Sequence, residues 1–160
     1  AATACEWLEY VEEPLASTES ARLGEWSTLT GLPFALDESV ENLTRESLLP
    51  LMLQDGCAAV VLKPTLVGGI EAAARLATIA RARGKRVVMT NAFESGVAHC
   101  HVTLWCGAFG GTGVAHGLNT YERLASDLLP TPFGEMVERH LVSVERAQAA
   151  LDELCDRELM

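Results

Sequence analysis

The stretch Cys57-Ala-Ala-Val-Val-Leu-Lys63 and, one segment later, Arg86-Val-Val-Met-Thr90 decide the fold class of this chain. Both are short apolar runs rich in valine, which is typical of strands buried on both faces of a sheet. The segment between them, Gly69–Arg83, repeats apolar residues at helical spacing and stops at Gly84. A strand, a helix and a second strand in this order predict a right-handed βαβ unit with parallel strands.

The same unit recurs along the chain at a nearly constant interval. Five apolar runs end near Glu12, Asp37, Lys63, Thr90 and His116, which lie 25 to 27 residues apart. Helical patterns fill the intervals, at Ser20–Thr30, Arg45–Gln54, Gly69–Arg83 and Ser95–Phe109. This alternation predicts an α/β protein with a parallel sheet, either an open doubly wound sheet or a (β/α)8 barrel.

Three features favour the barrel. The interval between strand ends is nearly constant, as expected of a barrel built from repeated strand–helix units. The informative polar residues fall at the carboxyl ends of the strands, where barrel enzymes keep their sites. No strand is followed by the glycine fingerprint of a dinucleotide-binding unit. The glycine-rich stretch Gly107–Gly113 follows a helix and precedes a strand, so we interpret it as a loop.

The repeat count bears on whether the barrel is complete. A barrel closes with eight units, whereas this chain carries five. An unclosed barrel would expose two sheet edges and part of its interior, which soluble proteins avoid. We therefore expect a partial TIM barrel over residues 1–134, completed by strands on the same chain or on a partner. Residues 135–160 repeat apolar positions at helical spacing and predict a C-terminal amphipathic helix or linker.

Composition excludes several classes of partner. The 160 residues carry 12 basic and 22 acidic side chains, a net charge of −10, which argues against binding nucleic acid or an anionic membrane. No apolar run reaches the roughly 20 residues of a membrane span, and the N-terminal residues lack the pattern of a signal peptide. The five cysteines form no Cys-x-x-Cys pair. A zinc site within His99–Cys106 is one interpretation, but packing is favoured because His99 and His101 would lie on different helix faces.

The side chains at three strand ends are candidates for chemistry. Alternate side chains of a strand share a face, so Glu12, Asp37 and Lys63 are expected to face the barrel mouth together. Two carboxylates suit a divalent hard cation such as Mg²⁺, and Lys63 beyond it would stabilise negative charge on a bound substrate. The alternative is that all three are polar strand ends running into solvated turns. Glu13 and Glu38 point to the opposite face, where helix capping or support of the site is expected.

Three motifs follow one another along the chain: Tyr10-Val-Glu-Glu-Pro-Leu15, Leu36-Asp-Glu-Ser39 and Val61-Leu-Lys-Pro-Thr-Leu-Val-Gly-Gly69. Together they resemble the muconate-lactonizing subgroup of the enolase superfamily. The Lys-Pro-Thr form and Phe93-Glu-Ser95 are most similar to the o-succinylbenzoate synthase family. His116-Gly-Leu-Asn-Thr-Tyr121, followed by Asp127-Leu-Leu129, resembles the plant and algal version. The resemblance covers roughly residues 8–129 and implies barrel strands four to eight, without the family's N-terminal capping domain.

The resemblance also implies roles for individual residues. Family members hold one Mg²⁺ through three carboxylates on successive strands, and Glu12 and Asp37 match the second and third. Lys63 matches the lysine of the sixth strand, which stabilises the substrate enediolate by a cation–π contact. Thr90 and Asn91 fall on the loop after the seventh strand, which is implied to contact the succinyl carboxylate.

The implied reaction is a dehydration. A succinyl-hydroxycyclohexadiene carboxylate loses water and becomes aromatic o-succinylbenzoate, a step in menaquinone or phylloquinone biosynthesis. The family's general base lies in a Lys-x-Lys motif, which this sequence does not contain, and the first metal carboxylate would lie one repeat before Glu12. We therefore expect the chain to be inactive alone and to need the missing barrel half and capping domain, in cis or in trans.

Two other functions remain open from the sequence. One is a dipeptide epimerase or N-acylamino acid racemase of the same superfamily, which also acts on a small carboxylate substrate. The other is a non-catalytic half-barrel that serves in folding or assembly. The expected compartment is bacterial cytoplasm or plastid stroma.

Overall fold

Four parallel strands form one sheet, in the order in which they occur along the chain. The computed structural model describes residues 7–110 and 113–124. Its strands are β1 (Val11–Glu12), β2 (Phe34–Leu36), β3 (Cys57–Leu62) and β4 (Arg86–Met89), paired β1-β2-β3-β4. In the wall of a barrel each new strand is added beside the previous one, whereas in a doubly wound sheet the order of the strands reverses at one point. The predicted partial (β/α)8 architecture is confirmed.

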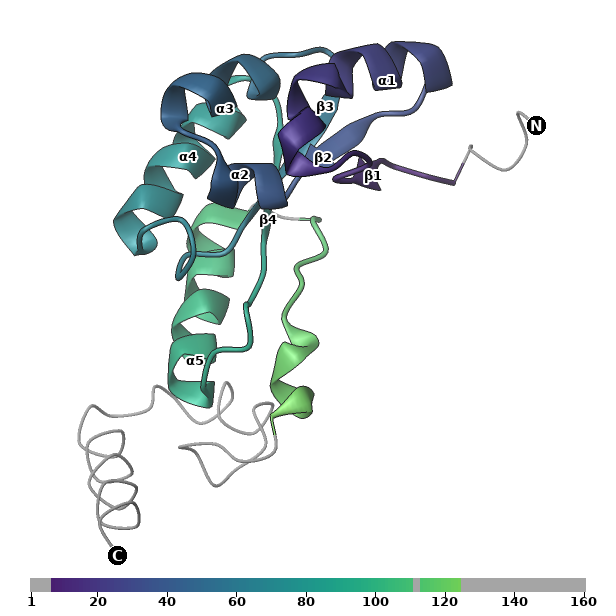
Figure 1. Ribbon diagram of the computed structural model, residues 1–160. Helices are drawn as coiled ribbons and strands as arrows, with labels where there is room; N and C mark the ends of the chain where they lie inside the picture. Colours follow the sequence, from purple (N-terminus) through teal and green to yellow (C-terminus); the bar gives the residue numbers. More distant parts are fainter. Residues whose placement is uncertain (1–6, 111–112, 125–160) are drawn as a thin grey trace, which may run out of the picture.

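Helices connect the strands and lie along one side of the sheet (Figure 1). The α-helices are α1 (Leu23–Thr30), α2 (Glu38–Asn42), α3 (Arg45–Met52), α4 (Ile70–Ala82) and α5 (Gly96–Trp105). Shorter turns are η2 (Ser17–Arg22), the π-helical η3 (Cys106–Gly110) and η4 (Asn119–Arg123). The four helical patterns expected from the sequence are therefore present, and α2 is an additional short helix directly after β2.

Local signals in the sequence account for the helix ends. Thr44 begins α3, where its side chain accepts a hydrogen bond from the backbone N–H of Ser47. Gly31 ends α1 in the left-handed region, with φ 70°, and Gly84 has the same φ just after α4. A residue without a Cβ adopts this conformation at little cost, so each glycine lets the chain turn back toward the next strand.

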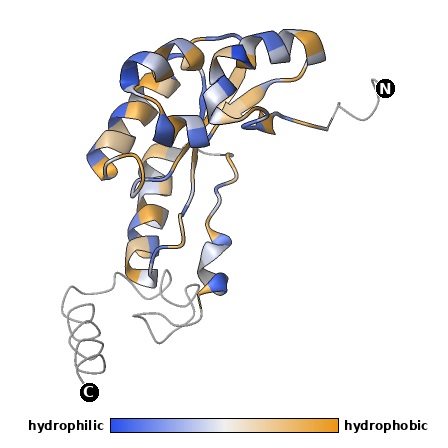
Figure 2. Ribbon diagram, viewed as in Figure 1, coloured by the Kyte–Doolittle hydropathy of each residue, from blue (hydrophilic) through white to orange (hydrophobic). Residues whose placement is uncertain are grey.

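The two faces of the sheet carry different side chains. Toward the helices, the strands bury larger apolar residues, namely Phe34, Leu36, Val60, Leu62, Val87 and Met89. Toward the opposite face they present Ala35, Ala59, Val61 and Val88, with Tyr10 and Val114 packed against them. Ala59 and Val61 share one face of β3, as alternate residues of a strand do. Figure 2 shows the helices alternating between apolar and polar stretches, as expected of elements buried on one side.

The prediction of an extended strand that ends near His116 is wrong. It is reduced to one isolated bridge, between Thr90 and Gly117. The cause is that the imidazole replaces part of the ladder: the backbone N–H of Met89 donates to Nδ1 of His116 at 3.1 Å. Burial lowers the pKa of His116, which keeps that ring nitrogen available as an acceptor.

The interpretation of the glycine-rich stretch as a loop also needs correction. Its first part continues α5 as the π-helical turn η3, in which the rings of Trp105 and Phe109 stack with centroids 4.6 Å apart. These residues lie four positions apart, so their stacking extends the helical path. The predicted helix or linker at 135–160, the segment Asp127–Leu129 and the cysteines Cys5 and Cys155 lie outside the described residues. Within the described ranges, no helix combines the length and apolar character that crossing a membrane requires.

Gly56, directly before β3, lies against Ser27 of α1. A Cβ on Gly56 would lie 2.4 Å from Oγ and 2.7 Å from Cβ of Ser27. Gly56→Ala is therefore expected to lower the free energy of unfolding by about 1–3 kcal/mol, because the helix must move away. Gly107→Ala is the control, since a Cβ there meets nothing within 4 Å. Urea unfolding of both variants measures the difference, and equal values would contradict the packing described.

Candidate active site at the carboxyl ends of the strands

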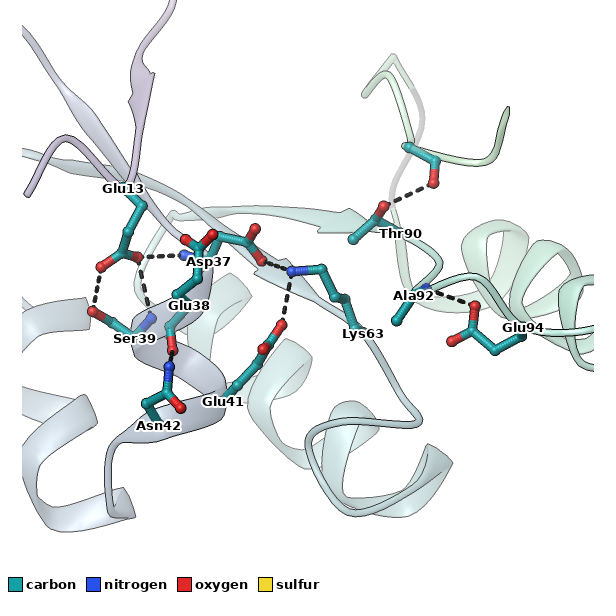
Figure 3. Close-up of polar contacts among 11 residues, drawn as sticks. Glu13, Asp37, Glu38, Ser39, Glu41, Asn42, Lys63, Thr90, Ala92 and Glu94 are labelled. Atoms are coloured by element: carbon teal, nitrogen blue, oxygen red, sulfur yellow. Dashed lines mark hydrogen bonds and ion pairs between the residues drawn. The ribbon is translucent and has the colours of Figure 1, made fainter. Parts of the chain in front are cut away.

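The strand ends place the predicted site residues along one edge of the sheet. Glu12 ends β1, Asp37 directly follows β2, Lys63 follows β3, and Thr90 follows β4. Because parallel strands paired in order end side by side, all four positions lie at the same edge. Figure 3 shows Asp37 and Lys63 turned toward one another across the ends of β2 and β3.

Lys63 is held by two carboxylates. Its Nζ donates to Oδ1 of Asp37 and, at 2.7 Å, to Oε1 of Glu41 (Figure 3). The three side chains are 16%, 10% and 20% exposed, respectively, so the ion pairs are largely withdrawn from water. In such surroundings an ammonium is stabilised by direct carboxylate partners, and an unpaired charge would be costly.

The electrostatics of this cluster are unbalanced toward negative charge. Burial raises the pKa of Asp37, and this effect outweighs the lowering by the Lys63 ammonium. Burial disfavours the charged form of Lys63, yet the hydrogen bonds to Asp37 and Glu41 prevail and raise the pKa of Lys63. The cluster therefore stabilises a cation within it.

Glu12 lies within electrostatic reach of this cluster. Burial raises its pKa, as does the negative charge of Asp37, while Lys63 lowers it. Within residues 7–110 and 113–124, no three side chains of the metal-ligating types gather closely enough to hold an ion. The described residues thus offer two carboxylates, Glu12 and Asp37, whose oxygen donors and mutual repulsion suit a hard divalent cation. A complete shell requires further ligands.

Glu13 fastens the end of β1 to the start of α2. Its Oε2 accepts from the backbone N–H groups of Asp37, at 2.8 Å, and Ser39, at 3.2 Å, and its Oε1 accepts from Oγ of Ser39. Glu13 adopts a φ of 37°, an uncommon value for a residue with a side chain. The predicted capping role of Glu13 is confirmed, and it fixes the backbone from which Asp37 projects. Glu38 is exposed in the first turn of α2.

Thr90 and Asn91 face opposite sides of the sheet. The hydroxyl of Thr90 donates to the carbonyl of Gly117 at 2.8 Å. The side chain of Asn91 is buried, and its Nδ2 contacts Nδ1 of His99 in α5. Thr90 is thus on the side of the mouth, whereas Asn91 points toward the helices. Their roles in substrate binding stay a prediction.

His99 and His101 occupy different sides of α5, as their spacing predicts. His99 is 1% exposed and belongs to the interior, whereas His101 is exposed. Cys106 is buried in the core between sheet and helices, where burial raises its pKa to about 11. These positions support the interpretation of this segment as packing.

Two contacts at the mouth were missed by the sequence interpretation. The first is the contact of Glu41 with Lys63. Glu41 lies four residues after Asp37, and this spacing, which places both side chains on one side of a helix start, could have indicated it. Thr65 donates through Oγ1 to Oε1 of Glu94 at 2.5 Å. The Lys-Pro-Thr and Phe-Glu-Ser segments therefore contact each other, which no spacing within either motif indicates.

The family described as "Enolase C-terminal domain-like" matches residues 1–148. The chain belongs to this family. The Arabidopsis thaliana protein named "Protein PHYLLO, chloroplastic" is 35% identical over 79% of this chain and 8% of its own length. The o-succinylbenzoate synthase of Aliivibrio salmonicida is 36% identical over 57% of this chain and 26% of its own length. The chain thus spans a small part of these relatives, and the resemblance drawn from its motifs is confirmed.

Solved structures agree with this membership. MenC from Desulfotalea psychrophila superposes with a TM-score of 0.68 and 26% identity, over 78% of this chain and 34% of that one. The N-succinyl Arg/Lys racemase from Bacillus cereus superposes with a TM-score of 0.62 and 21% identity, over 76% of this chain and 32% of that one. The second likeness concerns the fold alone. Members of one architecture therefore include enzymes of more than one reaction type.

Glu13 provides a test of how the mouth is built. Glu13→Gln is expected to lower the free energy of unfolding by about 1.5–3 kcal/mol, because hydrogen bonds from Asp37 and Ser39 lose a charged acceptor. Glu38→Gln removes an exposed charge from the neighbouring helix start and should change it by at most about 0.5 kcal/mol. Chemical unfolding followed by circular dichroism measures both. Equal losses would show that Glu13 does not fasten β1 to α2.

Proposed function

We propose that this chain forms part of an o-succinylbenzoate synthase, which dehydrates a succinyl-hydroxycyclohexadiene carboxylate to o-succinylbenzoate. The observation that carries the proposal is the pairing of Lys63, within its Lys-Pro-Thr motif, with Asp37 at the shared end of β3 and β2. Relatives named o-succinylbenzoate synthase support the choice of reaction. The proposed pathway context is menaquinone or phylloquinone biosynthesis.

The carboxylates and the ammonium have complementary roles in the proposal. Glu12 and Asp37 would supply two oxygen ligands for Mg²⁺, and the bound ion would supply positive charge that stabilises the substrate carboxylate. Lys63 stabilises the negative charge that spreads over the substrate when the proton next to its carboxylate is removed. The hydroxyl group then leaves as water after taking up a proton, and the ring becomes aromatic. The loop that carries Thr90 and Asn91 is proposed to lie near the succinyl group, with Thr90 on the side of the mouth and the Asn91 side chain buried against α5.

The same edge also presents apolar surface that suits a ring. Leu66 and Phe93, in the loops after β3 and β4, are 49% and 57% exposed. The hydrogen bond between Thr65 and Glu94 joins these two loops. Phe93 adopts a φ of 64°, and non-glycine residues held in this region concentrate at functional sites. Apolar side chains beside charged ones match a substrate that combines a hydrocarbon ring with carboxylates.

The proposed reaction needs groups that the described residues do not provide. These are a general base and a third carboxylate ligand, and the family places the base in a Lys-x-Lys motif that is absent from the sequence. We propose that a further barrel segment and a capping domain supply them, in cis or in trans. The 160-residue chain alone is then expected to show no turnover, and appreciable turnover by the purified chain would contradict this.

Substitution of Lys63 tests the proposed function directly. In the full polypeptide that carries this sequence, assayed with the cyclohexadiene substrate and Mg²⁺, Lys63→Met is expected to lower kcat/KM at least about 100-fold, because charge in the transition state loses its stabilising partner. The measurement is the loss of diene absorbance. Lys85→Met is the matched control. Lys85 is the other lysine of the sequence and precedes β4 at the opposite end of the strand, where it donates to the carbonyl of Gln54.

Other outcomes identify the alternatives. Unchanged turnover in Lys63→Met would exclude the role given to Lys63. A wild-type polypeptide that racemises N-acylamino acids or epimerises dipeptides but leaves the diene intact would be a racemase of the same superfamily. If neither substrate is converted, and Lys63→Met and Asp37→Asn leave every activity of the parent polypeptide unchanged, this half-barrel serves assembly instead.

A further inference from the structure

Lys63 has one more acidic partner than the family's chemistry requires. Asp37 is a proposed metal ligand, but nothing in the proposed reaction uses Glu41. Glu41 lies on α2, one helical turn beyond Asp37, and its Oε1 accepts from Nζ of Lys63 at 2.7 Å. Its side chain is 20% exposed, which is unusual for a glutamate without a structural or functional partner. This contact therefore calls for a role.

Asp37 is subject to two competing demands. Its Oδ1 accepts from the Lys63 ammonium, yet in the proposed function the same carboxylate binds a divalent cation. An ammonium and a metal ion repel each other, so full engagement of Asp37 by Lys63 disfavours binding of the ion. If Asp37 were the sole partner of Lys63, the two would form a neutral pair that attracts a cation weakly.

We propose that Glu41 is a positioning residue that holds the ammonium of Lys63 when Asp37 turns to the metal. This inference rests on the proposed function. Because Glu41 contacts Lys63 through a second carboxylate, the ammonium keeps a partner at the mouth when Asp37 turns away. The ammonium has three N–H donors, so the bond to Glu41 leaves two for the substrate. Glu41 also leaves the cluster with a net negative charge, which attracts a divalent cation.

Metal affinity is the readout that separates this role from a merely structural one. Binding of Mn²⁺, used in place of Mg²⁺ and followed by electron paramagnetic resonance, is measured for the full polypeptide and its variants. Glu41→Gln is expected to raise the Kd for Mn²⁺ about five- to tenfold, because Lys63 then stays on Asp37. Glu38→Gln is the matched control: it removes the same charge from the same helix, at an exposed residue with no ion pair to Lys63 among the described residues. We expect a change below about threefold for it.

A double-mutant cycle shows whether Glu41 acts through Lys63. In the Lys63→Met background, Glu41→Gln should raise the Kd by no more than Glu38→Gln does, because no ammonium remains to compete for Asp37. Circular dichroism and the unfolding midpoint of each variant establish that the proteins compared are folded. An excess effect of Glu41→Gln that persists without Lys63 would overturn the inference.

The remaining outcomes distinguish this inference from the proposed function. If the wild type binds Mn²⁺ and Glu41→Gln and Glu38→Gln change the Kd equally, the role of Glu41 is overturned and the metal site stands. Absence of Mn²⁺ binding by the wild type would overturn both. A Glu41 effect on Mn²⁺ binding in a polypeptide that does not dehydrate the diene would support the inference and reject the proposed reaction.

Discussion

The carboxyl ends of β1, β2, β3 and β4 meet at one edge because the four strands run parallel and pair in chain order. Every feature of the candidate site depends on this constraint. Residues separated by about one repeat in the sequence become neighbours, which brings the ammonium of Lys63 onto Asp37. The small side chains on the opposite face of the sheet, such as Ala35 and Ala59, let Tyr10 and Val114 pack there. The larger ones on the helical side supply the main core.

At this edge, hydrogen bonds fix the backbone at the start of α2, and the ionic side chains beside it carry a net negative charge. Glu13 accepts hydrogen bonds from two backbone N–H groups at the start of α2 and so holds Asp37 in place. Asp37, Glu41 and Lys63 are largely buried and carry one more negative than positive charge, with Glu12 nearby. Fixed, partly desolvated charges of this kind cost little reorganisation when a charged ligand arrives, which is the arrangement that electrostatic catalysis requires.

Much of this could be predicted from the sequence, because the relevant signals are local or periodic. The interval between strand ends and the alternation within strands indicated the parallel sheet and the side of the sheet on which Asp37 and Lys63 lie. The prediction of a fifth strand was wrong because a side-chain nitrogen of His116 takes the place of a backbone acceptor. The apolar pattern of a sequence carries no information about such a contact. The contact between Thr65 and Glu94 joins two loops, and such pairing depends on the tertiary fold. Glu41 was overlooked although its spacing from Asp37 was informative.

The energetic coupling between Asp37 and Lys63 tests most directly whether the strand ends converge on one site. The free energies of unfolding of Asp37→Asn, Lys63→Met and the double variant, measured by urea denaturation without added metal, provide it. We expect a coupling of about 1–3 kcal/mol, because a largely buried ion pair joins the ends of β2 and β3. A coupling below about 0.3 kcal/mol would show that the two side chains do not interact. The convergence of strand ends on one site would then be contradicted.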